Sequence, residues 1–199
     1  MHISEGILSG GVLAVGWAGT VAGVSFGLKR TNPDRIIQTA LISSAFFLAS
    51  LVNVRIGPSS THLTLLAPMG LILGQAVFPA VLVALLLQAV LFGFGGLAVL
   101  GANTVVMGVP ALAVSMIFGR AVRVATGRGR VAVLSFMAGT LAVMMGAGIA
   151  GIMLWMTDAD FAGAVKLLLV AHVPVAVIEG VVTAFLVMWL KKSAPEFLS

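Results

Sequence analysis

Apolar residues fill most of the chain in long runs, and short polar or glycine-containing connections separate these runs. Most runs are about 18 to 25 residues long, the length at which an α-helix crosses the hydrocarbon core of a bilayer, and they lack the ten-residue alternation of membrane β-strands. The pattern therefore predicts an all-α integral membrane protein with seven spanning helices. The predicted helices cover roughly residues 8–28, 36–54, 60–77, 79–100, 104–119, 131–156 and 164–190.

The composition agrees with this pattern. Of the 199 residues, 60% are hydrophobic and 9% are charged, and the mean hydropathy is +1.19, whereas a soluble domain carries about 25% charged residues. No repeat with a period of about 20 to 50 residues is present, so residues 1–199 are expected to form a single transmembrane domain. Because the chain contains no cysteine, it has neither a disulfide framework nor a thiolate metal site.

Basic residues are concentrated in the connections on one predicted side of the membrane. Nine of the eleven follow the first, fifth and seventh predicted helices, while Arg55 and Lys166 fall on the other side with Glu5, Asp158 and Asp160. The positive-inside rule then puts the nine in the cytoplasm, the amino terminus outside and the carboxyl terminus inside, which requires an odd number of spans. The nine are Lys29, Arg30, Arg35, Arg120, Arg123, Arg128, Arg130, Lys191 and Lys192. We expect a multi-pass protein of the cell (inner) membrane, and no nucleic-acid partner, despite the net charge of +5.

Glycine recurs every fourth residue in the first predicted helix, at Gly19, Gly23 and Gly27. Small residues on one face let helix backbones approach closely in a membrane. The stripe predicts close packing within the chain, and the alternative is a docking face for another membrane protein.

Ionisable side chains at membrane depth are the most informative residues in so apolar a chain. His62 follows a predicted turn at Gly57 and Pro58, and we expect it in the first turn of the helix that begins near residue 60, on the same outer face as His2. The hydroxyl residues before it can cap that helix: Ser59, Ser60 and Thr61. The alternative reading is that a histidine at a helix start is itself only a polar cap.

His172 and Glu179 lie seven residues apart in "AHVPVAVIEG", so on a helix they share one face about two turns apart. Pro174 predicts that a helix starts or kinks there. His172 is expected nearer the outside and Glu179 near mid-membrane. A buried glutamate can also pair simply with a hydroxyl or with His172.

The opening "MHISEG" lacks the basic residue and apolar run of a secretory signal, and we expect Met1 to be retained. A free α-amine, the amide nitrogen of residue 2 and the His2 ring can close fused five- and six-membered chelate rings around one cation. His62 could supply a fourth nitrogen. A planar nitrogen field suits Ni(II) or Cu(II) and can accommodate Co(II), and its affinity should fall in acid because the amide must lose its proton.

Three motifs together resemble the cobalt/nickel substrate-binding (S) subunits of energy-coupling-factor transporters, the CbiM/NikM family: "MHISEG", "IGPSSTHL" and "AHVPVAVIEG". The resemblance covers essentially the whole chain. It implies a seven-helix subunit whose extra first helix carries the metal-binding amino terminus inward. It also implies Co(II) or Ni(II) bound by the Met1 amine, the amide nitrogen and ring of His2, and His62. The sequence looks closer to the cobalt type, which points to cobalamin biosynthesis, although Ni(II) has the higher intrinsic affinity.

The resemblance further implies partners: a transmembrane coupling (T) subunit, cytoplasmic ATPase subunits and often a small membrane accessory subunit. The chain itself has no G-x-x-x-x-G-K-[ST] motif, so ATP hydrolysis is expected in the partners, and we expect neither an enzyme nor a cofactor of its own. The transported ion is then the substrate of the assembly.

Six polar residues are expected to hydrogen-bond the metal ligands or to gate the site, because a metal-bound histidine usually donates its other N–H to an oxygen. They are Ser59, Ser60, Thr61, Asn103, His172 and Glu179. The alternative function is a stand-alone secondary metal or cation transporter that uses His172 and Glu179 as a relay, which would usually carry inverted repeats that this sequence lacks. A membrane metalloenzyme is a poorer reading, since no HExxH arrangement is present.

Overall fold

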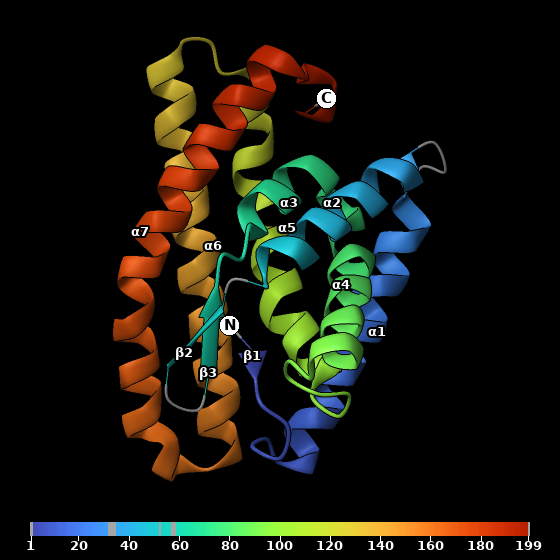
Figure 1. The fold of residues 1–199 in the computed structure, drawn as a ribbon, viewed down its shortest axis with the longest axis vertical. Coiled ribbons are helices and arrows are strands. Elements are labelled where there is room, and N and C mark those ends of the chain that lie inside the picture. Colours follow the sequence, from blue (N-terminus) through green and yellow to red (C-terminus); the bar gives the residue numbers. More distant parts are fainter. Residues whose placement is uncertain (1, 32–34, 52, 57–58, 199) are drawn as a thin grey trace.

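The computed structural model describes residues 2–31, 35–51, 53–56 and 59–198, and for 53–56 and 59–62 it describes the backbone. The described part is nearly all helical (Figure 1). Its α-helices are α1 Gly10–Arg30, α2 Ile36–Ala49, α3 Leu66–Leu73, α4 Val77–Phe92, α5 Leu100–Val124, α6 Arg128–Thr157 and α7 Ala162–Ser193. Its 3-10 turns are η2 Gly74–Ala76, η3 Ala159–Phe161 and η4 Pro195–Leu198, and its strands are β1 His2–Ile3, β2 Asn53–Ile56 and β3 Ser59–His62.

Five segments of the described residues are long and apolar enough to cross a membrane, so the chain is a multi-pass membrane protein. They are Gly10–Arg30, Leu66–Phe92, Leu100–Val124, Arg128–Thr157 and Ala159–Ser193. The remaining apolar helix, α2, has 14 residues, fewer than the roughly 20 that a span needs. The prediction of seven spanning helices is therefore not confirmed, because it counted apolar length and missed where the backbone leaves the helical conformation.

The prediction of a helix from residue 60 is wrong. Residues 59–62 form β3, which pairs with β1 on one side and β2 on the other in the sheet order β1-β3-β2. The predicted helix 36–54 likewise ends with α2 at Ala49, and 53–56 form β2. His62 is consequently the last residue of a strand rather than the first turn of a helix. The residues Ser59, Ser60 and Thr61 do not cap a helix either, since α3 begins at Leu66 with Leu65 at its N-cap position.

The break expected between the predicted helices 60–77 and 79–100 lies a few residues earlier. Gly74 has a positive φ of 56° at the end of α3, which glycine adopts without steric cost. α4 then begins at Val77 and runs through Pro79, whose missing N–H removes no bond because it lies in the first helical turn. α4 ends at Phe92, and a loop with positive-φ glycines leads into α5.

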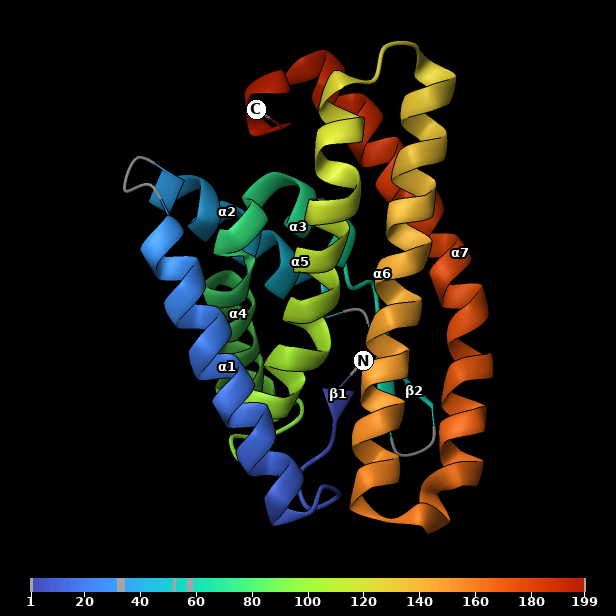
Figure 2. The same ribbon diagram turned by 180° about the vertical axis from the view of Figure 1, so that it is seen from behind.

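β1 lies between the long α6–α7 hairpin and the group formed by α1, α4 and α5, and β3 and β2 lie beside it, over α6 in this view (Figure 1). α5 is central and contacts α1, α3, α4 and α6, as the reverse view also shows (Figure 2). One end of the molecule holds the ends of α1, α5 and α7 and the starts of α2 and α6 (Figure 1). The nine basic residues predicted to share a side lie in or next to these helix ends.

The glycine stripe of α1 packs within the chain, as predicted. A Cβ on Gly23 would meet the ring of Phe78, and one on Gly27 would lie 2.7 Å from the carbonyl oxygen of Gln75. Gly16, on the same helix, faces the backbone of Ala102 in α5. α1 is therefore held against α4 and α5 by contacts that leave no room for side chains.

We predict that Gly16→Ala destabilises the protein. The added Cβ would lie 2.7 Å from the Cα of Ala102, so two helix backbones would have to separate; overpacking of this kind costs about 1–3 kcal/mol. The matched control is Gly11→Ala on the same helix, where nothing lies within 4 Å. Thermal unfolding of the purified protein in detergent should show a lower midpoint for the first variant only. Equal midpoints for both variants would contradict this packing.

Candidate functional site

The first residues of the chain form a strand inside the helical bundle. β1 pairs antiparallel with β3, with His2 opposite Ser60 and Ile3 opposite Ser59. β3 also pairs with β2, where Asn53 lies opposite His62. The sheet thus brings the amino-terminal segment beside the strand that carries His62, although the two are about sixty residues apart in sequence.

Asn103 in the first turn of α5 fixes β1 from the other side. Its Oδ1 accepts the N–H of Ile3 at 2.9 Å, and its Nδ2 donates to the carbonyl oxygen of Ile3 at 3.0 Å. The side chain is buried, and it takes up both main-chain groups of Ile3 as a neighbouring strand would. This matters because an unpaired backbone group buried in a membrane protein costs several kcal/mol.

The residues after β1 are tied to the loop before α5 and to α6. The N–H of Glu5 donates to the carbonyl oxygen of Gly95 at 2.8 Å, and its carboxylate accepts the N–H of Ala98 at 3.0 Å. The N–H of Ser9 donates to the hydroxyl of Thr157 at 3.2 Å. From the sequence, Glu5 was expected only to carry a charge on the outer side. Its place within "MHISEG" was the one sequence feature that could have indicated that it bonds to the loop before α5.

The imidazole of His2 is enclosed by the protein. Its side chain is 2% exposed, and its ring centroid lies 6.3 Å from that of Phe94. A buried imidazole provides a nitrogen that can bind a metal ion or hold a proton. The strand therefore presents a nitrogen donor in the interior of the bundle.

The structure does not describe the metal-binding atoms of the other predicted ligands. Met1 is outside the described residues, and the side chains of Ser59, Ser60, Thr61 and His62 are outside them as well. Among the side chains that are described, no group of three His, Asp or Glu converges on a common point. The backbone register alone relates His2 to the strand of His62.

Glu179 of α7 holds the turn that follows β3. Its carboxylate accepts the N–H of Thr64 and of Leu65, the latter at 3.2 Å, and the side chain is 1% exposed. Leu65 has a positive φ of 47°, a conformation uncommon for residues other than glycine. Among the described residues, the Glu179 carboxylate accepts these hydrogen bonds from the backbone amides of Thr64 and Leu65. Sequence patterns identified the residue but could not show what it binds.

His172 lies in the same helix and is bonded elsewhere. Its Nδ1 is 2.8 Å from the carbonyl oxygen of Leu168, so Nδ1 carries the hydrogen and Nε2 is the free acceptor. Nε2 is buried without a hydrogen-bond partner in the described part of the chain. α7 continues unbroken through Pro174, so no helix starts there, and the alternative of a kink at Pro174 stays a prediction.

Comparison with known proteins relates this geometry to metal transport. Residues 2–197 match the family described as the cobalt uptake substrate-specific transmembrane region, CbiM. A protein of Haemophilus influenzae named as a candidate metal transport protein is 38% identical, with 100% of this chain and 97% of that protein covered. The cobalt transport protein CbiM of Kyrpidia tusciae is 31% identical, with 100% and 86% covered. The fused nickel transport protein NikMN of Rhodobacter capsulatus is 29% identical, with 100% and 64% covered.

Solved structures share the fold. One described as a truncated transition metal transporter superposes with a TM-score of 0.79 at 25% identity, covering 96% of this chain and 99% of that one. A second, described as a transition metal transporter, gives a TM-score of 0.75 at 24% identity, covering 96% and 93%.

We predict that Asn103→Ala releases the amino-terminal strand. The substitution removes both bonds to Ile3, so hydrogen–deuterium exchange of a peptide covering residues 2–8 should become faster. Thr104→Val is the matched control, because among the described residues the Thr104 hydroxyl bonds to the carbonyl oxygen of Leu100 within its own helix and not to β1. Unchanged exchange in Asn103→Ala would show that β3 alone holds the strand.

Proposed function

The chain belongs to the CbiM family of cobalt-uptake substrate-specific transmembrane regions, and from this premise we propose that it is the metal-capture subunit of an ATP-driven energy-coupling-factor importer. Its substrate is divalent cobalt or nickel. Relatives are named for both metals, and the motifs noted in the sequence favour cobalt. The observation that carries the proposal is the amino-terminal strand, which is fixed inside the bundle with the His2 imidazole buried.

We infer that four nitrogen atoms bind the ion: the α-amine of Met1, the amide nitrogen and ring nitrogen of His2, and the ring of His62. The pairing of β1 with β3 supports this set, because it brings the first residues beside the strand that ends at His62. Nitrogen donors suit Co(II) and Ni(II) and not Mg²⁺ or Ca²⁺, which prefer oxygen. Binding displaces protons from the amine, the amide and the rings, so uptake weakens in acid.

Two residues position this set without binding the ion. Asn103 holds Ile3 next to His2, and Glu179 holds the amides of Thr64 and Leu65, two and three residues after His62. Each acts from a different long helix on one of the two strands. The hydroxyl residues Ser59, Ser60 and Thr61 directly precede His62 in β3, and we propose that they hydrogen-bond the ligands.

The proposal also covers orientation and partners. The end that gathers the nine basic residues faces the cytoplasm, and the ion enters from the opposite side. The shorter helices α2 and α3 lie within the membrane and complete a seven-helix domain with the amino terminus outside. ATP is hydrolysed by cytoplasmic ATPase subunits that act through a transmembrane coupling subunit, with a small accessory membrane subunit. The fused protein NikMN, which is longer than this chain, supports such an assembly.

We predict that placing two leucines between Met1 and His2 abolishes metal uptake. The amine can then no longer close a five-membered ring with the amide nitrogen of the histidine. The same two leucines added after Ser199 are the matched control. Uptake of labelled cobalt by cells should fall to background in the first variant only, with equal amounts of both proteins in the membrane. Uptake at the control level would rule out the terminal amine as a ligand.

A second prediction separates positioning from a proton relay at Glu179. Glu179→Leu removes the acceptor of the buried Thr64 amide and of the part-buried Leu65 amide, at a cost of about 1–3 kcal/mol for a buried group left unpaired, and should weaken cobalt binding to the purified protein. Glu179→Gln keeps an acceptor oxygen and should bind and transport far better than the leucine variant. Thr183→Val on the same helix serves as control.

The proposed capture subunit and the alternative, a stand-alone secondary transporter, predict different behaviour for the Glu179→Gln variant. A relay that carries protons on the Glu179 carboxylate would fail in transport with glutamine as completely as with leucine. It would also continue to move metal when the ATPase partner is inactivated. Either result would favour the stand-alone secondary transporter.

A further inference from the structure

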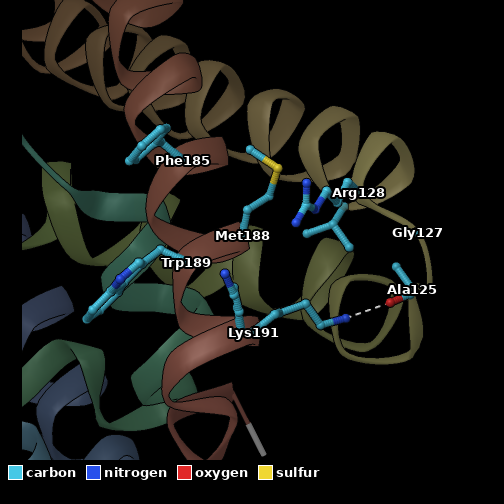
Figure 3. A pocket seen from close by; sticks show the side chains of 9 residues that line it. Ala125, Gly127, Arg128, Phe185, Met188, Trp189 and Lys191 are labelled. Atoms are coloured by element: carbon cyan, nitrogen blue, oxygen red, sulfur yellow. Dashed lines mark hydrogen bonds between the residues drawn. The ribbon is translucent and has the colours of Figure 1, made fainter.

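A pocket of about 620 Å³ opens at the basic end of the molecule, where the connection between α5 and α6 meets the last turns of α7 (Figure 3). Its lining combines two kinds of side chain. Arg128, Lys191 and Lys192 are cationic, and Phe185, Met188 and Trp189 are apolar. None of the described residues that line it is acidic.

Lys191 is already bonded within the protein. Its ammonium donates to the carbonyl oxygens of Val122 and Ala125, both at 2.7 Å, and to that of Arg123 at 3.1 Å. It thereby satisfies carbonyl groups at the carboxyl end of α5, where a cation is also favoured by the helix dipole. Lys191 therefore fixes the wall of the pocket and is not available to a ligand.

Arg128 and Lys192 carry the uncompensated charge. Both are exposed, and neither has a hydrogen bond or ion pair to another described residue. Arg128 is also the first residue of α6, a position at which the helix dipole disfavours a cation. An anion between these two side chains would offset both costs.

The apolar part of the lining points to the rest of the ligand. Phe185 and Trp189 lie one turn apart on α7 and are 71% and 56% exposed. Tryptophan is enriched where a membrane protein meets the headgroup layer. The pocket thus has cations at its polar end and an aromatic wall that continues along a membrane-spanning helix, which matches the phosphate and the acyl chain of one phospholipid molecule.

We propose that this pocket binds an anionic phospholipid, with its phosphate between Arg128 and Lys192 and an acyl chain along Phe185 and Trp189. Basic pockets between helices at the membrane surface recognise lipid headgroups through this combination of charge and apolar contact. The site is separate from the amino-terminal strand, and the proposal does not depend on which ion the protein carries.

The test uses the full chain purified in detergent and examined by native mass spectrometry with added phosphatidylglycerol or phosphatidylcholine. The wild-type protein should retain phosphatidylglycerol preferentially. Arg128→Gln combined with Lys192→Gln should reduce that affinity roughly tenfold or more. The matched control, Arg120→Gln combined with Arg123→Gln, removes two cations from the same end but outside this pocket, and should keep the preference.

A second measurement locates the lipid. In a variant that keeps only Trp189, made by Trp17→Phe and Trp155→Phe, phosphatidylglycerol with brominated acyl chains should quench the fluorescence, and the Arg128/Lys192 substitutions should restore it. Equal loss of lipid in the control pair would mean that only general surface charge is involved, and would overturn the proposal. So would a lack of preference between the two lipids, which is the result expected if the pocket instead receives an acidic segment of a partner protein.

Discussion

The structure depends on keeping an extended backbone fully hydrogen-bonded inside a membrane protein. The amino-terminal strand β1 enters the bundle without a helix to pair its own N–H and C=O groups, and hydrocarbon offers no water in their place. β3 supplies pairing on one side and the Asn103 side chain on the other. This requirement explains why residues 53–56 and 59–62 are strands in the middle of an otherwise helical chain.

β1 and the turn after β3 are each held by a side chain from a long helix. α6 and α7 pack closely because Gly139 and Gly180 have no side chains, and a Cβ at either position would collide with the facing helix. The Thr140 hydroxyl also donates a hydrogen bond from α6 to the carbonyl oxygen of Ala176 in α7 at 3.2 Å. Glu179 projects from this pair to the turn after β3. Asn103 projects from the central helix α5. The metal-binding nitrogen atoms that we propose are therefore positioned by two separate parts of the bundle.

The sequence could predict those features that depend on neighbours along the chain. Apolar length identified α1, α5, α6 and α7, and the spacing of Gly19, Gly23 and Gly27 predicted the packing of α1. It could not predict β3, because four residues rich in hydroxyl groups after the dipeptide Gly57-Pro58 resemble a helix cap as much as a strand. The pairing of His2 with Ser60 and the bond from Thr64 to Glu179 join distant residues, and no local pattern encodes such contacts. The count of seven spans was not confirmed, because apolar length alone does not show where the backbone leaves the helical conformation, as it does at β2 and β3.

X-ray absorption spectroscopy at the cobalt edge of the purified, cobalt-loaded protein determines whether the amino-terminal strand binds the metal. We expect four nitrogen atoms bound to cobalt, with the outer scattering pattern of two imidazole rings. A six-coordinate set of oxygen atoms, like that of the hydrated ion, would contradict this, because the amino-terminal strand would then have no part in binding the metal.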